Sequence, residues 1–300
     1  MFAAMSVIWG LPYLLIKIAV GGVPVPVLVL ARVTIGAALL LPIALQRRQL
    51  GALRPVWRWL VLFAVVEIIV PWYVLSEAER SISSSLTGLL VASVPIMVAL
   101  LSLLIGVGDR ISVIRWVGLL VGLAGVALLV GPSLLGSGAT SGSARSVLEV
   151  LFVALCYASG PLIATRKLAD VPPLGMTAAC LVLASVVYAP LAALSWPSAV
   201  PSARVLLAIA GLAVICTAGA FVIFFRLIAE AGPARASVIT YINPAIAVTL
   251  GVLVLGERVT PVMLAAFGTI LAGSVLATRP ARRGQAPDAE LVAARRVLAD

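Results

Sequence analysis

The sequence predicts an all-α membrane protein in which ten transmembrane helices form two inverted repeats of five. Composition is the first reason, because 63% of the 300 residues are hydrophobic and 11% are charged, whereas soluble proteins carry about a quarter charged residues. The second is a series of apolar runs about 20 residues long, which is the length of a helix that crosses a bilayer. The third is an internal repeat, because Pro95 and Pro244 lie 149 residues apart. Three further pairs share that offset: Pro12 and Pro161, Lys17 and Arg166, and Pro24 and Pro173.

The apolar runs are long, continuous and non-alternating, so we expect helices rather than the strands of a membrane barrel. They cover residues 3–20, 26–45, 57–78, 82–106, 112–131, 147–166, 172–195, 204–228, 234–256 and 260–278. The connections between them are short and rich in Gly, Pro and Ser. The segment from Gly131 to Ser146 is rich in Gly and Ser, and it indicates a flexible linker between the two repeats.

The repeat divides the chain into two units of five helices. The first repeat is expected at residues 3–131 and the second at 147–278, with a linker at 132–146 and a polar, alanine-rich tail at 279–300. Because five is odd, the second unit must be inverted relative to the first. Inverted repeats in an apolar chain are typical of secondary transporters, whose substrate site lies where the repeats meet.

Positive charges predict the orientation, since cytoplasmic loops of membrane proteins are rich in Lys and Arg. With the N-terminus inside, the inward segments hold fifteen of the 21 cations and the outward segments four, while Lys17 and Arg32 lie at or within spans. We therefore expect both termini in the cytoplasm, the tail included, and the protein in the cytoplasmic membrane. The same asymmetry accounts for the net charge of +10, so no nucleic-acid partner is expected.

Residues for enzyme chemistry are scarce. There is no histidine, and the three cysteines lie inside spans at no metal-ligand spacing, so neither a metal nor a cofactor is expected. A Gly-x-Gly-Asp sequence ends at Asp109, but an intramembrane aspartyl protease needs a second aspartate at membrane depth. The alternative to a transporter is a membrane enzyme acting on a lipid-linked substrate. It would need a cluster of His, Asp or Glu at one interface, and the sequence offers none.

Glu67 is the strongest candidate for transport chemistry. It lies ten residues into the third run, about 15 Å along a helix that rises 1.5 Å per residue. That places it near the middle of a hydrocarbon core about 30 Å thick. A carboxyl group at this depth should face the bundle interior, where it could take up a proton and couple transport to the proton gradient. The alternative is a structural carboxyl group that is neutral, or bonded to a helix end or to Arg32.

Other candidates allow two interpretations each. Arg32 is expected either to snorkel to the bilayer surface or to face a cavity as a partner of the substrate or of Glu67. Lys17 is expected to anchor a helix end, with gating or anion contact as the alternative. Aromatic residues within spans either stack on an organic solute or serve packing: Trp9, Trp72, Tyr73, Tyr157 and Tyr241. Prolines inside spans predict interrupted helices around a transport site: Pro71, Pro95 and Pro244.

Several local motifs, in this order, resemble one known family. They are Trp9-Gly10 before Lys17, Arg32, Ser83 to Leu90 before Pro95, Asp109-Arg110-Ile111-Ser112, Asn243-Pro244, and Gly256-Glu257-Arg258-Val259-Thr260. Over residues 3 to 278 the chain resembles the EamA group of the drug/metabolite transporter superfamily. One departure is Cys156-Tyr157, which stands near the place where a second Trp-Gly pair would be. The resemblance implies export or exchange of a small organic metabolite or drug through a central cavity, without nucleotide hydrolysis, and adds Asn243 to the candidate site residues.

Overall fold

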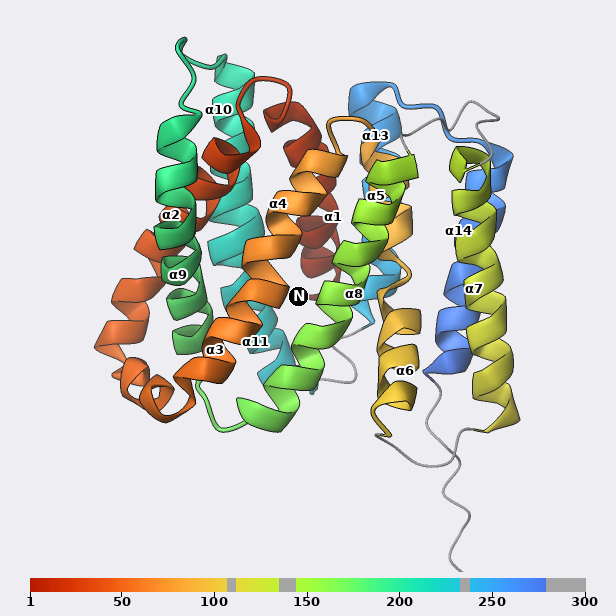
Figure 1. Ribbon diagram of the computed structural model, residues 1–300, viewed down its shortest axis with the longest axis horizontal. Helices are drawn as coiled ribbons and strands as arrows, with labels where there is room; N and C mark the ends of the chain where they lie inside the picture. Colours follow the sequence, from red (N-terminus) through yellow and green to blue (C-terminus); the bar gives the residue numbers. More distant parts are fainter. Residues whose placement is uncertain (107–111, 135–143, 233–237, 279–300) are drawn as a thin grey trace, which may run out of the picture.

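The computed structural model describes residues 1–106, 112–134, 144–232 and 238–278, and within these ranges every regular element is helical (Figure 1). Eight helical stretches are long and apolar enough to cross a membrane, and two shorter apolar helices follow them. The all-helical, multi-spanning architecture predicted from the sequence is confirmed. The predicted tail, the predicted turn at Asp109 and the first residues of the predicted 234–256 span lie outside the described residues.

The first half of the chain contributes five apolar stretches. Two of them are segmented: the third contains a 3-10 helix and a π-helical turn, and the fourth is divided in two. In order, the elements are α1 (Phe2–Ala19), α2 (Val25–Gln46), the 3-10 helix η1 (Gln49–Val56), α3 (Trp57–Ala64), the π-helix η2 (Val65–Ile69), α4 (Val70–Ala78), α5 (Ser84–Val91), α6 (Val94–Leu104) and α7 (Val113–Leu134).

The second half of the chain has one segmented stretch, which also holds a π-helix. Its elements are α8 (Ala144–Lys167), α9 (Pro173–Leu194), α10 (Ala203–Ala210), the π-helix η3 (Gly211–Gly219), α11 (Ala220–Ala231), α13 (Ile239–Leu255) and α14 (Pro261–Ala277). Because α7 ends at Leu134 and α8 begins at Ala144, both ends of the linker expected at 132–146 are helical instead.

Prolines mark two of the breaks in these helices. Proline has no backbone N–H and cannot continue the ladder of hydrogen bonds. Pro71 lies where η2 passes into α4, and Pro95 lies in the first turn of α6, after the break that follows α5. Pro244 differs, because α13 runs without interruption from Ile239 to Leu255 through it. The interruption expected there is absent, since Pro244 falls early in the helix, where a lost bond affects only the first turns.

Close helix pairs brace the two edges of the bundle. At one edge α7 packs along α14, and at the opposite edge α2 packs along α9 (Figure 1). Glycines bring α7 and α14 together: a Cβ on Gly273 would overlap the backbone of Gly122, and one on Gly125 would come within 2.8 Å of the Ile270 nitrogen. Between these edges lie α1, α4, α5, α8 and α13, and the central helices carry most of the candidate residues.

Candidate functional site

Arg32 is a buried cation where three elements meet. It projects from α2 and is only 7% exposed. Its Nε donates a hydrogen bond to Thr217 Oγ1 of η3 at 3.0 Å, and its Cζ lies 3.6 Å from the centre of the Trp72 ring of α4. A cation over an indole face is stabilised by the negative face of the ring. Arg32 therefore points into the bundle, and the snorkelling interpretation is wrong.

The π-helix η3 prepares Thr217 to accept this bond. The Thr217 hydroxyl donates its own proton to the Leu212 carbonyl, five residues earlier, at 2.8 Å. Since the proton is committed there, the oxygen lone pairs face Arg32 as acceptors. Thr217 is not predictable as a site residue from the sequence, because a single threonine in an apolar run carries no distinguishing signal. Its partner lies 185 residues away in the chain.

Arg32 has no carboxylate partner among the described residues. The ion pairs found there are Arg80 with Glu77 at 3.4 Å and Arg145 with Glu149 at 2.8 Å. Arg32 makes its hydrogen bond to Thr217 through Nε. Its Nη nitrogens have no acceptor in the described part of the chain. Burial of a charge without a partner is costly, and such a group is poised for an anionic ligand.

Glu67 lies in η2, and one of its carboxylate oxygens is buried against a neighbouring helix. Its Oε2 is buried and has no hydrogen-bond partner among the described residues. This oxygen presses against Gly160 of α8, where any Cβ would overlap it. No hydrogen bond or ion pair joins Glu67 to Arg32 in the described structure, so the pairing considered as an alternative is absent. What remains is a mid-helix carboxyl group facing a neighbouring helix, without a cation.

A tyrosine from α9 supports the π-helix that carries Glu67. Tyr188 donates a hydrogen bond to the carbonyl oxygen of Ile69, the last residue of η2, at 2.5 Å. The Tyr188 ring also stacks on Tyr73, with ring centres 6.2 Å apart. The predicted candidate Tyr73 thus packs against the support of η2. Tyr157, from α8, lies within electrostatic range of both Arg32 and Glu67.

Three predicted candidates are engaged elsewhere. The Trp9 ring packs on Phe224, with ring centres 4.5 Å apart. The Tyr241 and Thr278 hydroxyls are 3.1 Å apart. With the Asn243 amide assigned so that its nitrogen faces the Ile239 and Ser6 carbonyls, the nitrogen donates to both, at 2.8 and 3.1 Å, and ties α13 to α1.

A polar cluster lies where α4 ends and α5 begins. Lys17 Nζ donates to the carbonyls of Glu79 and Ile82, at 2.5 and 2.8 Å, so its ammonium group turns into the protein rather than toward the bilayer surface. The Glu257 carboxylate accepts four hydrogen bonds, from the backbone nitrogens and the hydroxyls of Ser84 and Ser85, at 2.5 to 2.9 Å. A carboxylate at a helix N-terminus is also favoured by the helix dipole.

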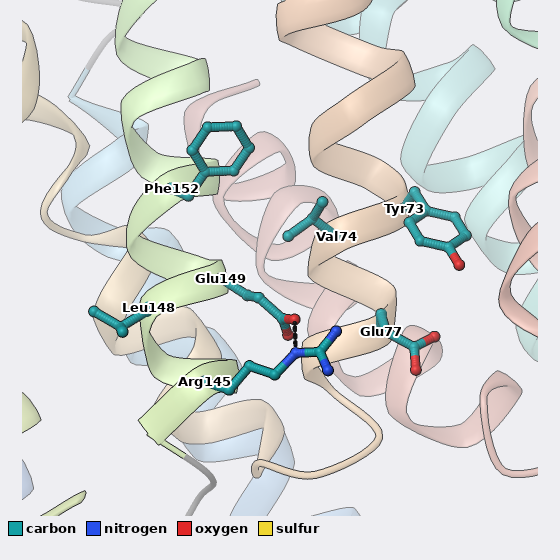
Figure 2. A pocket seen from close by; sticks show the side chains of 7 residues that line it. All are labelled: Tyr73, Val74, Glu77, Arg145, Leu148, Glu149 and Phe152. Atoms are coloured by element: carbon teal, nitrogen blue, oxygen red, sulfur yellow. Dashed lines mark hydrogen bonds and ion pairs between the residues drawn. The ribbon is translucent and has the colours of Figure 1, made fainter. Parts of the chain in front are cut away.

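A separate cavity of about 760 Å³ lies between α4 and α8 (Figure 2). Polar groups and apolar walls share its lining, and Arg145 bonds Glu149 within it. Its lining residues are Tyr73, Val74, Glu77, Arg145, Leu148, Glu149 and Phe152. Tyr73 is thus the one predicted candidate that lines it. Within the described ranges, no group of three or more His, Cys, Asp or Glu could hold a metal ion.

Comparisons with known proteins agree on the kind of molecule. The uncharacterized inner membrane transporter YedA of Escherichia coli K12 is 29% identical over 280 residues, which cover 92% of this chain and 88% of YedA. YedA of Escherichia coli O157:H7 matches equally. A protein of known crystal structure with 22% identity shares the fold, with a TM-score of 0.65 over 92% of this chain and 95% of its own.

The family match falls on two long segments of the chain. The sequence profile of the EamA-like transporter family matches residues 1–131 and 144–279. Together these segments span most of the chain and include α2, α4 and η3, which position Arg32. The protein is a member of the EamA-like transporter family.

Proposed function

We propose that this protein is a secondary transporter that moves a small organic solute with an anionic group across the cytoplasmic membrane, outward. The observation that carries the proposal is Arg32, a buried cation that has no carboxylate partner among the residues that the structure describes. Its two neighbours come from different halves of the chain, Trp72 from the first and Thr217 from the second. A substrate site between the two halves is what transporters with internal repeats use.

The proposed architecture is a pair of inverted five-helix repeats, residues 3–131 and 147–278. Two π-helices support it, because η2 and η3 occupy corresponding places in the third stretch of each half. At the repeat offset of 149 residues, Glu67 corresponds to Cys216 inside η3. Packing gives further support, since α2 packs on α9, α5 on α13 and α7 on α14, each a helix against its counterpart.

The chemistry of Arg32 favours a carboxylate or a similar anion on the solute. A guanidinium group presents parallel N–H donors that match two oxygens of one anion. Arg32 covers one π-face of Trp72, so that face is not free to stack on the solute. The solute instead contacts the guanidinium group beside the ring. Binding then completes the hydrogen bonds that the Nη nitrogens lack.

Glu67 is proposed to carry the coupling proton. Its Oε2 is buried, and no donor or cation in the described part of the chain bonds it, which is an environment that suits the neutral acid. An ionised carboxylate at membrane depth costs several kcal/mol, so gaining or losing a proton changes the energy of the conformation. A proton gradient can therefore shift the balance between the conformation that favours protonated Glu67 and the one that favours ionised Glu67.

The substrate role of Arg32 is tested by solute counterflow in proteoliposomes. For carboxylate solutes, we expect Arg32→Met to lose transport at least about tenfold, because one charge-assisted contact contributes roughly 1.5–3 kcal/mol. Arg32→Lys keeps the charge but lacks the parallel donors, so its loss should be smaller and lie mainly in apparent affinity. Arg58→Met, at an arginine beside the Trp57 ring, is the control. Wild-type counterflow by Arg32→Met would contradict the proposal.

Both termini are proposed to lie in the cytoplasm, on the charge asymmetry of the loops. A reporter that is active only in the periplasm should be active when fused after Ser137. The same reporter fused after Asp170 or at Asp300 should be inactive. The reverse pattern would overturn the orientation and the inverted repeat together, whatever the solute is.

A further inference from the structure

Glu79 is a fully buried carboxyl group. It follows directly after α4 and is 0% exposed. Neither of its carboxylate oxygens has a hydrogen-bond partner within the described part of the chain. Buried polar side-chain atoms nearly always have one, so a carboxyl group with none on either oxygen needs an explanation. The mechanism proposed above makes no use of it.

The charged and titratable groups around Glu79 come from three directions. The Glu79 carboxyl group lies within electrostatic range of Lys17 and Tyr13 on α1, Arg32 on α2, and Glu257 in the turn after α13. The nearest cation, Lys17, gives its hydrogen bonds to backbone carbonyls, one of them that of Glu79 itself, and not to the carboxylate. Burial raises the pKa of the Glu79 carboxyl well above its usual range, and Glu257 adds to this, while Lys17 and Arg32 oppose it.

The surrounding bonds connect Glu79 to the start of α5. Lys17 holds the carbonyls of Glu79 and Ile82, the two sides of the turn between α4 and α5. Glu257 then holds the first residues of α5 through Ser84 and Ser85. With Glu79 neutral, Lys17 is free to make these backbone bonds. A negative charge on Glu79 would attract the same ammonium group away from them.

We propose that Glu79 is a proton-binding site that controls the turn between α4 and α5. With the proton bound, Lys17 clamps the turn as in this structure. When the proton leaves to water, Lys17 pairs with the carboxylate, and the turn loosens beside the start of α5. A raised pKa means that the proton is bound at low and neutral pH and is lost as the pH rises. This site is independent of solute identity and of Glu67.

Exposure of Ile82 reports the state of the turn, because Ile82 is only 3% exposed when Lys17 binds its carbonyl. Purified Ile82→Cys protein in detergent would be labelled with a water-soluble maleimide over a range of pH. Thiolate formation itself speeds labelling as the pH rises, so each rate is divided by that of Ser81→Cys, an exposed neighbour. The native cysteines are buried, and the parent protein serves as the blank.

The labelling ratio of Ile82→Cys should rise about tenfold as Glu79 loses its proton, which corresponds to a modest shift between two states. With Glu79→Gln, which mimics the protonated acid, the ratio should stay low at every pH. Glu77→Gln is the matched control, since Glu77 lies on the same helix end but is partly exposed and paired with Arg80. A flat ratio in the parent, or an equal rise with Glu79→Gln, would overturn the proposal.

Infrared difference spectra between low and high pH provide a second test, which requires no cysteine. The wild type and Glu77→Gln should lose a carboxylic-acid carbonyl band at high pH, and Glu79→Gln should lack that component. Lys17→Gln covers the case in which Glu79→Gln does not fold. Without the ammonium group, the band should persist to higher pH, because the cation no longer stabilises the carboxylate. An unshifted band in Lys17→Gln would count against the site. None of these measurements involves transport, so they can fail while the proposed function stands.

Discussion

Glu257 and Glu67 belong to the same helical bundle but differ in the hydrogen bonding of their carboxylate oxygens. The carboxylate of Glu257, at the start of α5, accepts four hydrogen bonds and joins segments 172 and 173 residues apart. Glu67, in the middle of a segmented helix, buries an oxygen that accepts none. A buried carboxyl group with no donor or cation beside it favours the neutral form, because an ionised carboxylate is costly to bury without a partner. The comparison contrasts a residue whose hydrogen bonds hold helices together with the residue proposed above to carry the coupling proton.

Removing the bonded carboxylate should produce the largest loss of stability. Glu257→Ala leaves the Ser84 and Ser85 donors at the start of α5 without an acceptor. We expect the free energy of unfolding to fall by about 2–4 kcal/mol, since each lost charge-assisted bond is only partly replaced by water. Thermal unfolding in detergent measures this loss. Glu257→Gln keeps one acceptor oxygen and should lose less. A stability equal to wild type in Glu257→Ala would contradict the claim that Glu257 holds the helices together.

A smaller effect is expected where Glu67 meets α8. Gly160→Ala places a Cβ on the buried Oε2, so either the carboxyl group or the helix must move. Overpacking of this kind costs roughly 1–3 kcal/mol. The double variant Gly160→Ala with Glu67→Ala should recover most of that loss, because the overlapping atoms are gone. Gly268→Ala, with open space around its Cβ, is the control. Additive losses in the double variant would show that the two residues do not touch.

Apolar runs were sufficient to predict the helices, because length and hydropathy alone decide which segments can cross a bilayer. Depth along the third run also predicted that Glu67 faces the bundle interior, and its Oε2 is buried against α8. The partners of the site were not predictable in this way. Thr217 meets Arg32 across 185 residues, and Ser84 meets Glu257 across 173. Such contacts depend on how the helices pack, and a single sequence carries no signal of that.

Two further differences have local causes. Asn243 and Trp9 were candidates for the site, yet both are engaged in helix packing, because polar and aromatic side chains also join helices in membranes. Pro244 was expected to break its helix as Pro95 does. The break before Pro95 is accompanied by a Ser93 hydroxyl bond to the Leu90 carbonyl at 2.6 Å, which helps to satisfy the backbone there. A proline alone does not decide where a helix ends.

The most direct test of the comparison is transport driven by a pH gradient in proteoliposomes, measured for Glu67→Gln and Glu257→Gln together. Glu67→Gln mimics the protonated acid, so it should fold as the wild type does, retain solute exchange and lose accumulation against a concentration gradient. Glu257→Gln should be less stable, yet the fraction that remains folded should still couple solute movement to the pH gradient. Accumulation at the wild-type rate by Glu67→Gln would contradict the account.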